Sequence, residues 1–276
     1  MSKPVALITG CSSGIGQAMA NTCLDEGYIV YATARNPDSL APLVERGAIA
    51  ITLDVNNADQ VNACSERVRS EAGRLDLLIN NAGYGAMGPI LDADRDTLLQ
   101  QFNTNVFAPL ELVRAHADLL RTAGGLIVNI GSVSGVTTTP FSGVYCASKA
   151  ALHAISDALR LELAPFGIKV LTVQPGAIAS EFGNNASAAI TMHDDSWFKP
   201  WEKAVQARAN ASQNASSTSA PDFATELMGY IKNPLRPETA LIGSGARNRV
   251  RMKRWLPPSV LDDRLRKRFN LDRPAD

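Results

Sequence analysis

The chain has 276 residues, of which 45% are hydrophobic and 20% are charged, and its formal net charge is zero. This composition is that of a globular domain with a sizeable core, and the lack of a basic excess argues against nucleic acid as the main partner. The four cysteines form no Cys-x-x-Cys pair and the three histidines are scattered, so we expect neither a metal site nor disulfides. We find no signal peptide and no apolar run long enough to span a bilayer, and we expect a cytoplasmic protein with reduced cysteines.

Short apolar runs alternate with helical patterns along the first 180 residues. This alternation predicts an α/β fold with a parallel sheet that is covered by helices on both faces. The predicted strands are 5–9, 29–33, 48–53, 75–79, 126–130 and 169–174, with a last strand near 238–242. The predicted helices are 15–26, 58–72, 97–121, 145–165 and 221–232. Ligands of such sheets bind beyond the carboxyl ends of the strands, where the polar clusters of this sequence fall.

The pattern changes after about residue 180 without marking a second domain. Residues 183–220 are rich in Asn, Ala and Ser, and we expect them to form a substrate lid. Residues 247–276 form a basic C-terminal extension. We therefore interpret 1–276 as a single domain that carries both segments.

A glycine-rich turn follows the first strand in the stretch LITGCSSGIG, residues 7–16. The helix that starts near Gly14 would aim free backbone N–H groups and its dipole at an anion. Gly10, Gly14 and Gly16 would permit the close approach of a pyrophosphate and positive φ angles. The alternative is a tight turn from strand to helix without a ligand.

Four further motifs follow later strands. They are NNAG at 80–83, Ser132 in NIGS, Tyr145 and Lys149 in YCASK, and Pro175-Gly176 in QPG. In this order, together with TGxxxGxG in the first turn, they resemble the short-chain dehydrogenase/reductase family over residues 4–180. The resemblance implies a Rossmann-type, doubly wound, mostly seven-stranded parallel sheet with helices on both faces. It also implies hydride transfer between a nicotinamide dinucleotide and a carbonyl or alcohol.

Tyr145 and Lys149 lie four residues apart and so share one face of a helix. A free tyrosine, with a pKa of about 10, is a poor proton shuttle near neutrality, and we expect Lys149 and an oxidised nicotinamide to lower that pKa. Tyr145 is then the acid in reduction and the base in oxidation. Ser132, thirteen residues earlier, is expected to hydrogen-bond the substrate oxygen, with Ser134 as its rival.

The resemblance gives a fourth catalytic role to Asn105, whose backbone carbonyl would hold a water that links Lys149 to solvent. Pro109 lies four residues later and has no N–H, so a kink should leave the Asn105 carbonyl free. Asn103 is the alternative for this role. A further alternative is that the proline merely kinks a surface helix.

NADP(H) is favoured over NAD(H) as the cofactor. At the end of the second strand, NAD-preferring relatives usually carry an acid where this chain has Ala34, and the Arg35 that follows suits a 2′-phosphate. Ser13 stands before Gly14 in place of a second basic residue. The expected cofactor-binding residues are Gly10, Ser12, Ser13, Gly14, Ile15, Gly16, Arg35, Asp54, Val55, Asn80, Ala82, Gly83, Tyr145, Lys149, Pro175, Gly176, Ile178 and Ser180.

The strand ending VYATAR and the tail RWLPPSVLDDRLRKRF resemble the branch with retinol dehydrogenases, 17-beta-hydroxysteroid dehydrogenases and acyl-dihydroxyacetone-phosphate reductase. This implies a lipophilic ketone or aldehyde of the retinoid, steroid or acyl-lipid kind. Trp197, Phe198 and Trp201 are expected to line an apolar substrate pocket with Ser132 and Tyr145, and packing of a lid helix is the alternative.

Several alternatives stay open at this point. The protein could be an NAD-dependent alcohol dehydrogenase of the same family, or a dinucleotide sensor without catalysis, although a sensor would be expected to lack the tyrosine or the lysine. The basic tail is interpreted as a solvated charged helix, with peripheral contact to an anionic membrane as the alternative. Relatives are often dimers or tetramers, so a homodimer or homotetramer is an open expectation, and the alternative is that the extended tail covers a usual interface.

Overall fold

The computed structural model describes residues 3–213 and 216–273, so positions 214–215 of the expected lid and 274–276 of the C-terminal extension lie outside it. Seven strands form one sheet in the order β3-β2-β1-β4-β5-β6-β9, and every neighbouring pair is parallel. The strands are β1 (Val5–Ile8), β2 (Ile29–Ala34), β3 (Ile49–Thr52), β4 (Leu77–Asn80), β5 (Leu126–Ile130), β6 (Lys169–Pro175) and β9 (Thr239–Ile242). The predicted Rossmann-type sheet is confirmed.

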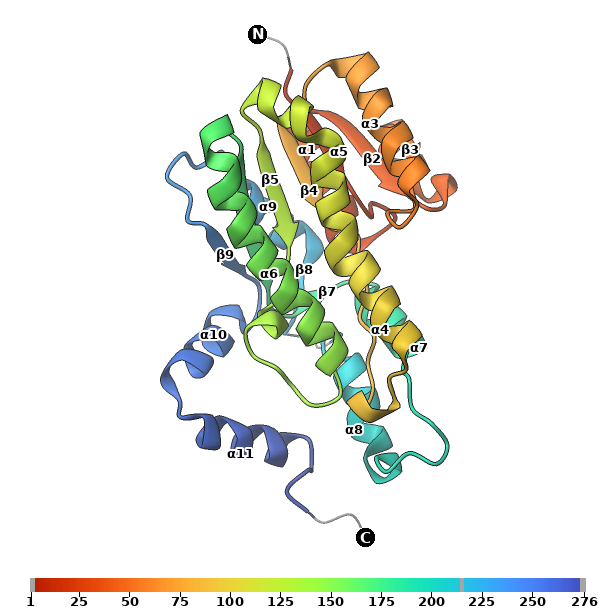
Figure 1. Ribbon diagram of the computed structural model, residues 1–276, viewed down its shortest axis with the longest axis vertical. Coiled ribbons are helices and arrows are strands. Elements are labelled where there is room, and N and C mark those ends of the chain that lie inside the picture. The colour runs from red at the N-terminus through yellow and green to blue at the C-terminus, as the bar shows by residue number, and fades with distance from the viewer. Residues whose placement is uncertain (1–2, 214–215, 274–276) are drawn as a thin grey trace.

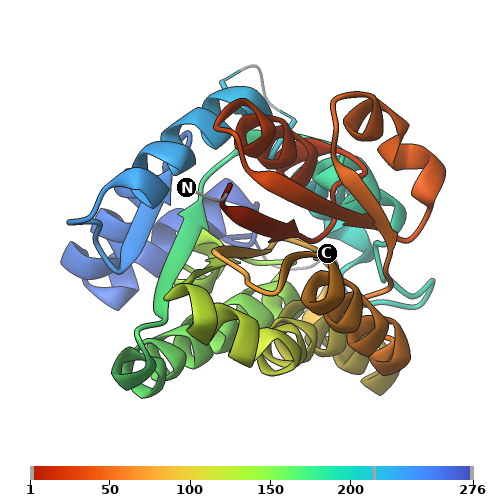
Figure 2. The ribbon, with the colours of Figure 1, turned by 90° about the horizontal axis from the view of Figure 1, so that it is seen from above.

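Helices cover both faces of this sheet (Figures 1 and 2). On one face lie α1 (Gly14–Asp25) and α9 (Ala220–Lys232), and on the other lie α3 (Ala58–Ala72), α5 (Ala108–Ala123) and α6 (Gly143–Leu163). Alternate side chains of a strand enter the two cores: Leu77 and Ile79 of β4 pack on the first face, and Leu78 packs on the second. Burial on both sides explains why the strands are continuous apolar runs in the sequence.

The helical pattern at 97–121 is broken in the structure into three pieces. These are α4 (Arg95–Phe102), the π-helical turn η3 (Asn103–Phe107) and α5. Because Pro109 has no N–H, the ordinary helical bond to the carbonyl of Asn105 cannot form. The N–H of Ala108 instead bonds to the carbonyl of Asn103, five residues back. The predicted kink is therefore a π-helical turn, a feature that is frequent at functional sites.

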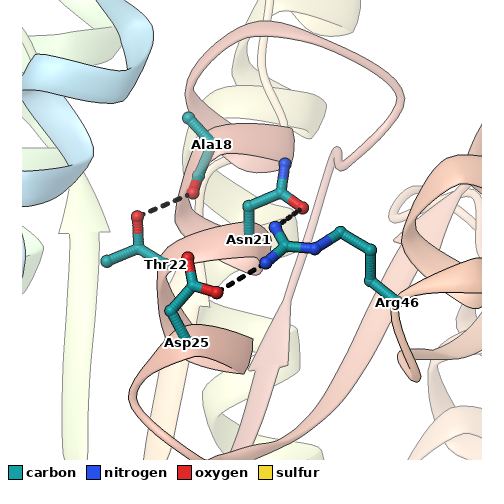
Figure 3. Close-up of polar contacts among 5 residues, drawn as sticks. All are labelled: Ala18, Asn21, Thr22, Asp25 and Arg46. Atoms are coloured by element: carbon teal, nitrogen blue, oxygen red, sulfur yellow. Dashed lines mark hydrogen bonds and ion pairs between the residues drawn. The ribbon is translucent and has the colours of Figure 1, made fainter.

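A short helix, α2 (Ala41–Glu45), precedes β3 and was not predicted, because five residues are too few to show a periodic pattern. Its C-cap residue, Arg46, donates from Nη1 to Oδ1 of Asn21 at 2.6 Å and from Nη2 to Oδ1 of Asp25 at 2.5 Å (Figure 3). Both partners belong to α1, so these contacts tie the connection between β2 and β3 to the helix that follows the glycine-rich turn. Exposed ion pairs of this kind add little stability.

The segments after β6 gather beyond the carboxyl ends of the strands (Figure 1). A two-stranded sheet of β7 (Ile178–Ala179) and β8 (Thr218–Ser219) closes the segment that we expected to be a lid, which contains α7 (Phe182–Ala188) and α8 (Glu202–Ala209). The basic extension forms α10 (Ala246–Trp255) and α11 (Pro258–Arg268). Short 3-10 turns occupy Pro37–Leu40, Ile90–Asp92, Val133–Gly135, Ala164–Phe166 and Lys199–Trp201. Among the described residues, no helix has the length and apolar character needed to cross a membrane.

Candidate active site

A cavity of about 830 Å³ opens where the carboxyl ends of five strands meet. Its lining includes the residue that follows β2, β4, β5 and β6, namely Arg35, Asn81, Gly131 and Gly176, and Gly10 just after β1. The order of the sheet reverses between β1 and β4, and doubly wound sheets bind their ligands at this point. The volume is within the usual range for a cofactor or ligand site.

The glycine-rich turn has the shape needed to accept a pyrophosphate. Gly10 and Gly14 have φ angles of +72° and +58°, and both line the cavity. At Gly16 a Cβ would lie 2.1 Å from the carbonyl oxygen of Gly10, so only glycine permits this packing. The side chain of the N-cap residue Ser13 makes no capping bond within the described structure, which leaves the N–H groups of the first turn of α1 for a ligand.

Thr9 and Asn81 hold the turn against the loop after β4, and sequence reasoning missed both. The Thr9 hydroxyl accepts from the N–H groups of Asn81 and Ala82 at 3.0 Å each. The Asn81 amide donates to the carbonyls of Thr9 and Gly10 at 2.8 and 3.1 Å. The signal was present in the sequence as the second asparagine of NNAG.

Asn80, the first asparagine of NNAG, does not line the cavity. It is the last residue of β4, is buried, and donates to Oδ1 of Asn129 in β5 at 2.8 Å. The structure places Asn81, and not Asn80, in the lining of the cavity, and a contact of Asn80 with the cofactor stays a prediction. Because side chains alternate along a strand, the Asn80 side chain points to the face covered by α5, where its Nδ2 lies 3.5 Å from the carbonyl of Pro109.

Most of the predicted cofactor residues meet at the cavity. The two exceptions are Gly16, which packs against the carbonyl of Gly10 behind the turn, and Asn80, whose side chain bonds to Asn129 instead of lining the cavity. The predicted residues that line the cavity are Gly10, Ser12, Ser13, Gly14, Ile15, Arg35, Asp54, Val55, Ala82, Gly83, Tyr145, Lys149, Pro175, Gly176, Ile178 and Ser180. A bound dinucleotide fits these residues, since the glycine turn, the backbone donors and Arg35 face one continuous space.

Ser132, Tyr145 and Lys149 converge on this cavity from β5 and α6. Ser132 forms a hydrogen bond with the Tyr145 side chain, and its own hydroxyl accepts from the N–H of Ser134 at 3.0 Å. Ser134 lies 3.4 Å from Nη2 of Arg208. The structure thus gives Ser132, rather than its rival Ser134, the contact with the tyrosine.

Burial raises the pKa of Tyr145, while the hydrogen bond from Ser132 and the charge of Arg208 lower it. We expected Lys149 to be the group that lowers this pKa. Its Nζ instead lies 6.0 Å from the centre of the tyrosine ring and donates to the carbonyl of Ile130 at 2.7 Å. Burial lowers the pKa of Lys149 to about 8. Burial is therefore the largest influence on the pKa of Tyr145, and the groups that lower this pKa are Ser132 and Arg208 rather than Lys149.

Asn105 lies behind these residues, buried and outside the lining of the cavity, whereas Asn103 lines it. The Asn105 side chain accepts from the N–H of Tyr84 at 3.2 Å and donates to the carbonyl of Tyr84 at 3.0 Å. It also donates to Oγ of Ser148, the neighbour of Lys149, at 3.1 Å. Asn105 therefore fixes the π-helical turn to α6 and to the loop after β4.

His153 is a third residue that sequence reasoning missed. Its Nε2 accepts from the backbone N–H of Ser132 at 3.3 Å, and burial with the charge of Lys149 lowers its pKa to about 4. A Cβ at Gly131 or Gly135 would lie 2.2 or 2.6 Å from its ring, so both glycines make room for it. The spacing was a usable signal, because His153 is one helical turn after Lys149.

The structure does not bring the three lid aromatics to the cavity. Trp197 is 81% exposed. Phe198 and Trp201 pack with Phe141 and Phe269, and Nε1 of Trp201 donates to the carbonyl of Asn270 at 2.6 Å. The alternative of lid packing is the one that this geometry favours. The apolar wall of the cavity comes from Tyr84, Met87, Phe182, Ala188 and Ala189.

The arrangement of Ser132, Tyr145 and Lys149 can supply the proton that must accompany a hydride transfer to a carbonyl group. A bound nicotinamide would supply or accept the hydride. Ser132 can hold a carbonyl oxygen next to the Tyr145 hydroxyl, which can then give that oxygen its proton. Lys149, at the same cavity, can assist the tyrosine with its charge. The fold and the site together define a nucleotide-binding oxidoreductase.

Comparisons with known proteins show to which family of oxidoreductases the chain belongs. Residues 4–191 match the short chain dehydrogenase family, and the chain belongs to this family. It is 40% identical to a short-chain dehydrogenase, PC-15, of Penicillium crustosum, over 84% of this chain and 86% of that protein. It is 34% identical to a short-chain dehydrogenase/reductase of Pestalotiopsis microspora, over 98% of this chain and 95% of that protein. It is 31% identical to the NADPH-dependent 1-acyldihydroxyacetone phosphate reductase of Saccharomyces cerevisiae, over 98% of this chain and 93% of that protein. A solved short-chain dehydrogenase of Streptomyces avermitilis is similar with a TM-score of 0.82 and 29% identity, over 100% of this chain and 99% of that chain.

Proposed function

We propose that the protein is an NADP(H)-dependent carbonyl reductase. It transfers a hydride from the nicotinamide to a lipophilic ketone or aldehyde and, in the reverse direction, from the corresponding alcohol to the oxidised nicotinamide. The observation that carries this proposal is the convergence of Ser132, Tyr145 and Lys149 on the cavity beside the glycine-rich turn. Tyr145 is the proton donor, Ser132 orients the substrate oxygen, and Lys149 supports the tyrosine. The Asn105 carbonyl holds the water that connects Lys149 to solvent, a role that the missing N–H of Pro109 supports.

The preference for NADP(H) rests on Arg35. This residue is exposed, lines the cavity, and forms no ion pair with a carboxylate in the described part of the chain. Ala34 before it is buried and supplies no acid that would bind a free ribose or repel a 2′-phosphate. The yeast relative is NADPH-dependent by name, which points the same way.

The lipophilic substrate rests on the walls of the cavity. Met87, Phe182, Ala188 and Ala189 offer apolar surface near Tyr145. The last two of these come from the segment 183–220, which supports its role as a substrate lid. Retinoids, steroids and acyl lipids are the substrate classes to test.

Two alternatives remain distinct from this proposal. An NAD-dependent alcohol dehydrogenase would keep the same catalytic residues but would not need Arg35. A sensor without catalysis would bind the dinucleotide and reduce nothing, and the presence of the whole catalytic set argues against it. A cytoplasmic location and assembly as a homodimer or homotetramer are part of the proposal, and the four free cysteines are consistent with a reducing compartment.

The test compares NADPH and NADH as reductants for a panel of apolar ketones. We expect kcat/KM to be at least about 10-fold higher with NADPH, and Arg35→Asp to remove that preference, because it replaces a phosphate partner by a repulsive charge. Arg264→Asp, an exposed position on α11, is the matched control and should keep the preference. Equal use of both cofactors by the wild type would favour the NAD-dependent alternative, and cofactor binding without any oxidation would favour the sensor.

A further inference from the structure

Two arginines line the cavity, and one of them, Arg208, lies near Tyr145. Arg208 comes from α8 and Arg249 from α10, and both line the cavity and are half-buried. Arg208 is close enough to Tyr145 for its charge to lower the pKa of that side chain. The two segments that carry these arginines lie outside the strands and helices that form the glycine-rich turn and the catalytic residues.

Neutral groups hold Arg208 in place. Its Nε donates to Oγ1 of Thr139 at 2.8 Å, and Nη2 lies 3.4 Å from Oγ of Ser134. Cys146 provides a further hydrogen bond. These contacts orient the guanidinium but leave its positive charge uncompensated.

The guanidinium of Arg249 has neither a hydrogen-bond partner nor an ion-pair partner among the residues that the structure describes. The backbone of Arg249 is engaged instead, since its carbonyl accepts from Oγ1 of Thr137 at 3.2 Å and its N–H donates to the carbonyl of Gly245 at 3.0 Å. Burial lowers the pKa of Arg249, and the charges of Arg208 and Arg268 lower it further. The arginines therefore repel one another at the edge of a partly desolvated cavity.

Two carboxylates, Asp54 and Glu181, also line the cavity. Asp54 follows β3, and Glu181 lies in the chain between Ser180, whose Cβ would lie 3.0 Å from a Cβ at Gly14, and Phe182, which packs on Tyr145. Neither acts on Arg208 or Arg249, whose charged neighbours in the described structure are each other, Arg268, Tyr145 and Cys146. Two half-buried cations without a counter-charge destabilise the fold, and such a cost is typical of a site that a ligand completes.

We propose that Arg208 and Arg249 form an anion-binding subsite for a phosphate or carboxylate group on the substrate, an inference that rests on the proposed reductase function. Guanidinium groups match both anions with paired N–H donors. Ser134 and Thr139 stand beside Arg208 as hydroxyl groups of the same wall. Together with the apolar wall at Met87 and Phe182, the subsite selects an amphiphilic carbonyl compound over an uncharged one.

The binding test uses protein saturated with NADPH, so that the cofactor's own phosphate sites are filled. Octyl phosphate, octanoate and octanol are titrated by calorimetry into the wild type, Arg249→Gln and Arg251→Gln. Arg251 is the matched control, because it is exposed, lies two residues further along α10 and so projects from another face of the helix. Thermal unfolding of each variant confirms that it is folded, and Arg249→Lys tests whether a positive charge restores binding.

We expect at least one anion to bind the wild type and Arg251→Gln about 10- to 100-fold more tightly than octanol, and Arg249→Gln to lose most of this preference. The tighter of octyl phosphate and octanoate identifies the anion. The subsite is refuted if octanol binds as tightly as both anions, or if Arg249→Gln keeps the preference of the wild type.

Reduction by the wild type of the neutral ketone 2-decanone and of its anionic counterpart 9-oxodecanoate is measured alongside. Lack of reduction of both ketones together with an intact anion preference counts against the proposed reductase function alone. Reduction of 2-decanone without any anion preference counts against the subsite alone.

Discussion

At the scale of single residues, the site depends on how burial and hydrogen bonds set proton affinities. Tyr145 is buried, which raises its pKa, and the groups that oppose this effect are Ser132 and Arg208. Lys149 is buried as well and has its pKa lowered to about 8. Burial thus moves the pKa of the tyrosine up and that of the lysine down, because it favours the neutral form of each group.

Replacing Tyr145 by Phe tests the proton-donor role. The change removes the hydroxyl and keeps the ring, so NADPH affinity should remain close to that of the wild type while kcat falls by about 100-fold or more. Stopped-flow turnover and fluorescence titration with NADPH measure the two quantities separately. A variant that kept more than about a tenth of the wild-type rate would contradict the assignment.

His153 gives the folded state a dependence on pH. Its pKa is about 4 in the folded protein and 6.5 is its ordinary value, so the unfolded chain binds the proton more tightly. The stability that comes from neutral His153 is complete above about pH 6.5 and is lost as the pH falls toward 4. His116 is also buried with a lowered pKa, so it contributes in the same direction.

In His153→Gln, the amide can still accept from the N–H of Ser132 but does not titrate. We expect its free energy of unfolding to fall less steeply than that of the wild type between pH 6.5 and 4. Urea unfolding at several pH values measures this slope, and the contribution of His116 is common to both proteins. Identical slopes would show that His153 does not titrate as described.

At the scale of elements, aromatic packing joins the lid to the C-terminal extension. Phe141 contacts Phe198 and Phe269 with ring centres 6.0 Å apart in each pair, and Trp201 contacts Phe198 at 6.2 Å. The bond from Trp201 to Asn270 ties the start of α8 to the end of α11. This cluster holds α11 against the lid, while α10, which carries Arg249, is held by the bond from Thr137 to the Arg249 carbonyl.

Trp201→Ala should loosen the extension and lower the free energy of unfolding by about 1–3 kcal/mol, because it removes apolar contact and one hydrogen bond. Hydrogen exchange at α11 and urea unfolding report the two effects. Trp197→Ala is the control, and it should change neither, since Trp197 is 81% exposed. Equal loss of activity on bulky ketones in both variants, with unchanged stability, would contradict this packing role and would support contact of Trp197 and Trp201 with the substrate.

At the scale of the whole molecule, the cavity joins segments that are far apart in the chain. Its lining extends from Gly10 to Arg249 and draws on both faces of the sheet and on the segments beyond it. A ligand that binds these segments only when they are assembled must stabilise the folded state.

NADPH at about 100 times its dissociation constant should therefore add about 2.7 kcal/mol to the free energy of unfolding. Differential scanning calorimetry would detect this as a rise in Tm of several degrees, on the order of 2–4 °C per kcal/mol. Arg35→Asp should show a smaller rise at the same NADPH concentration. An unchanged Tm at saturating NADPH would contradict a cofactor site at this cavity.

The sequence by itself determined the parallel sheet, the glycine-rich turn and the order of the motifs, because these depend on local patterns. Apolar runs predict strands that are buried on both faces, and Pro109 predicts the break at Asn105 from its missing N–H alone. Ser132, Tyr145 and Lys149 are also local signals, since each follows a strand end or lies on one helix face.

Only the tertiary structure decided which polar side chains face the cavity. Asn80 and Asn81 are identical neighbours, but Asn80 bonds to Asn129 of β5 on the face covered by α5, whereas Asn81 lines the cavity. The contact between His153 and Ser132 joins α6 to β5, and Arg208 meets Arg249 across 41 residues, the difference between 249 and 208. Such contacts between distant segments depend on packing, which a periodic pattern in the sequence does not specify.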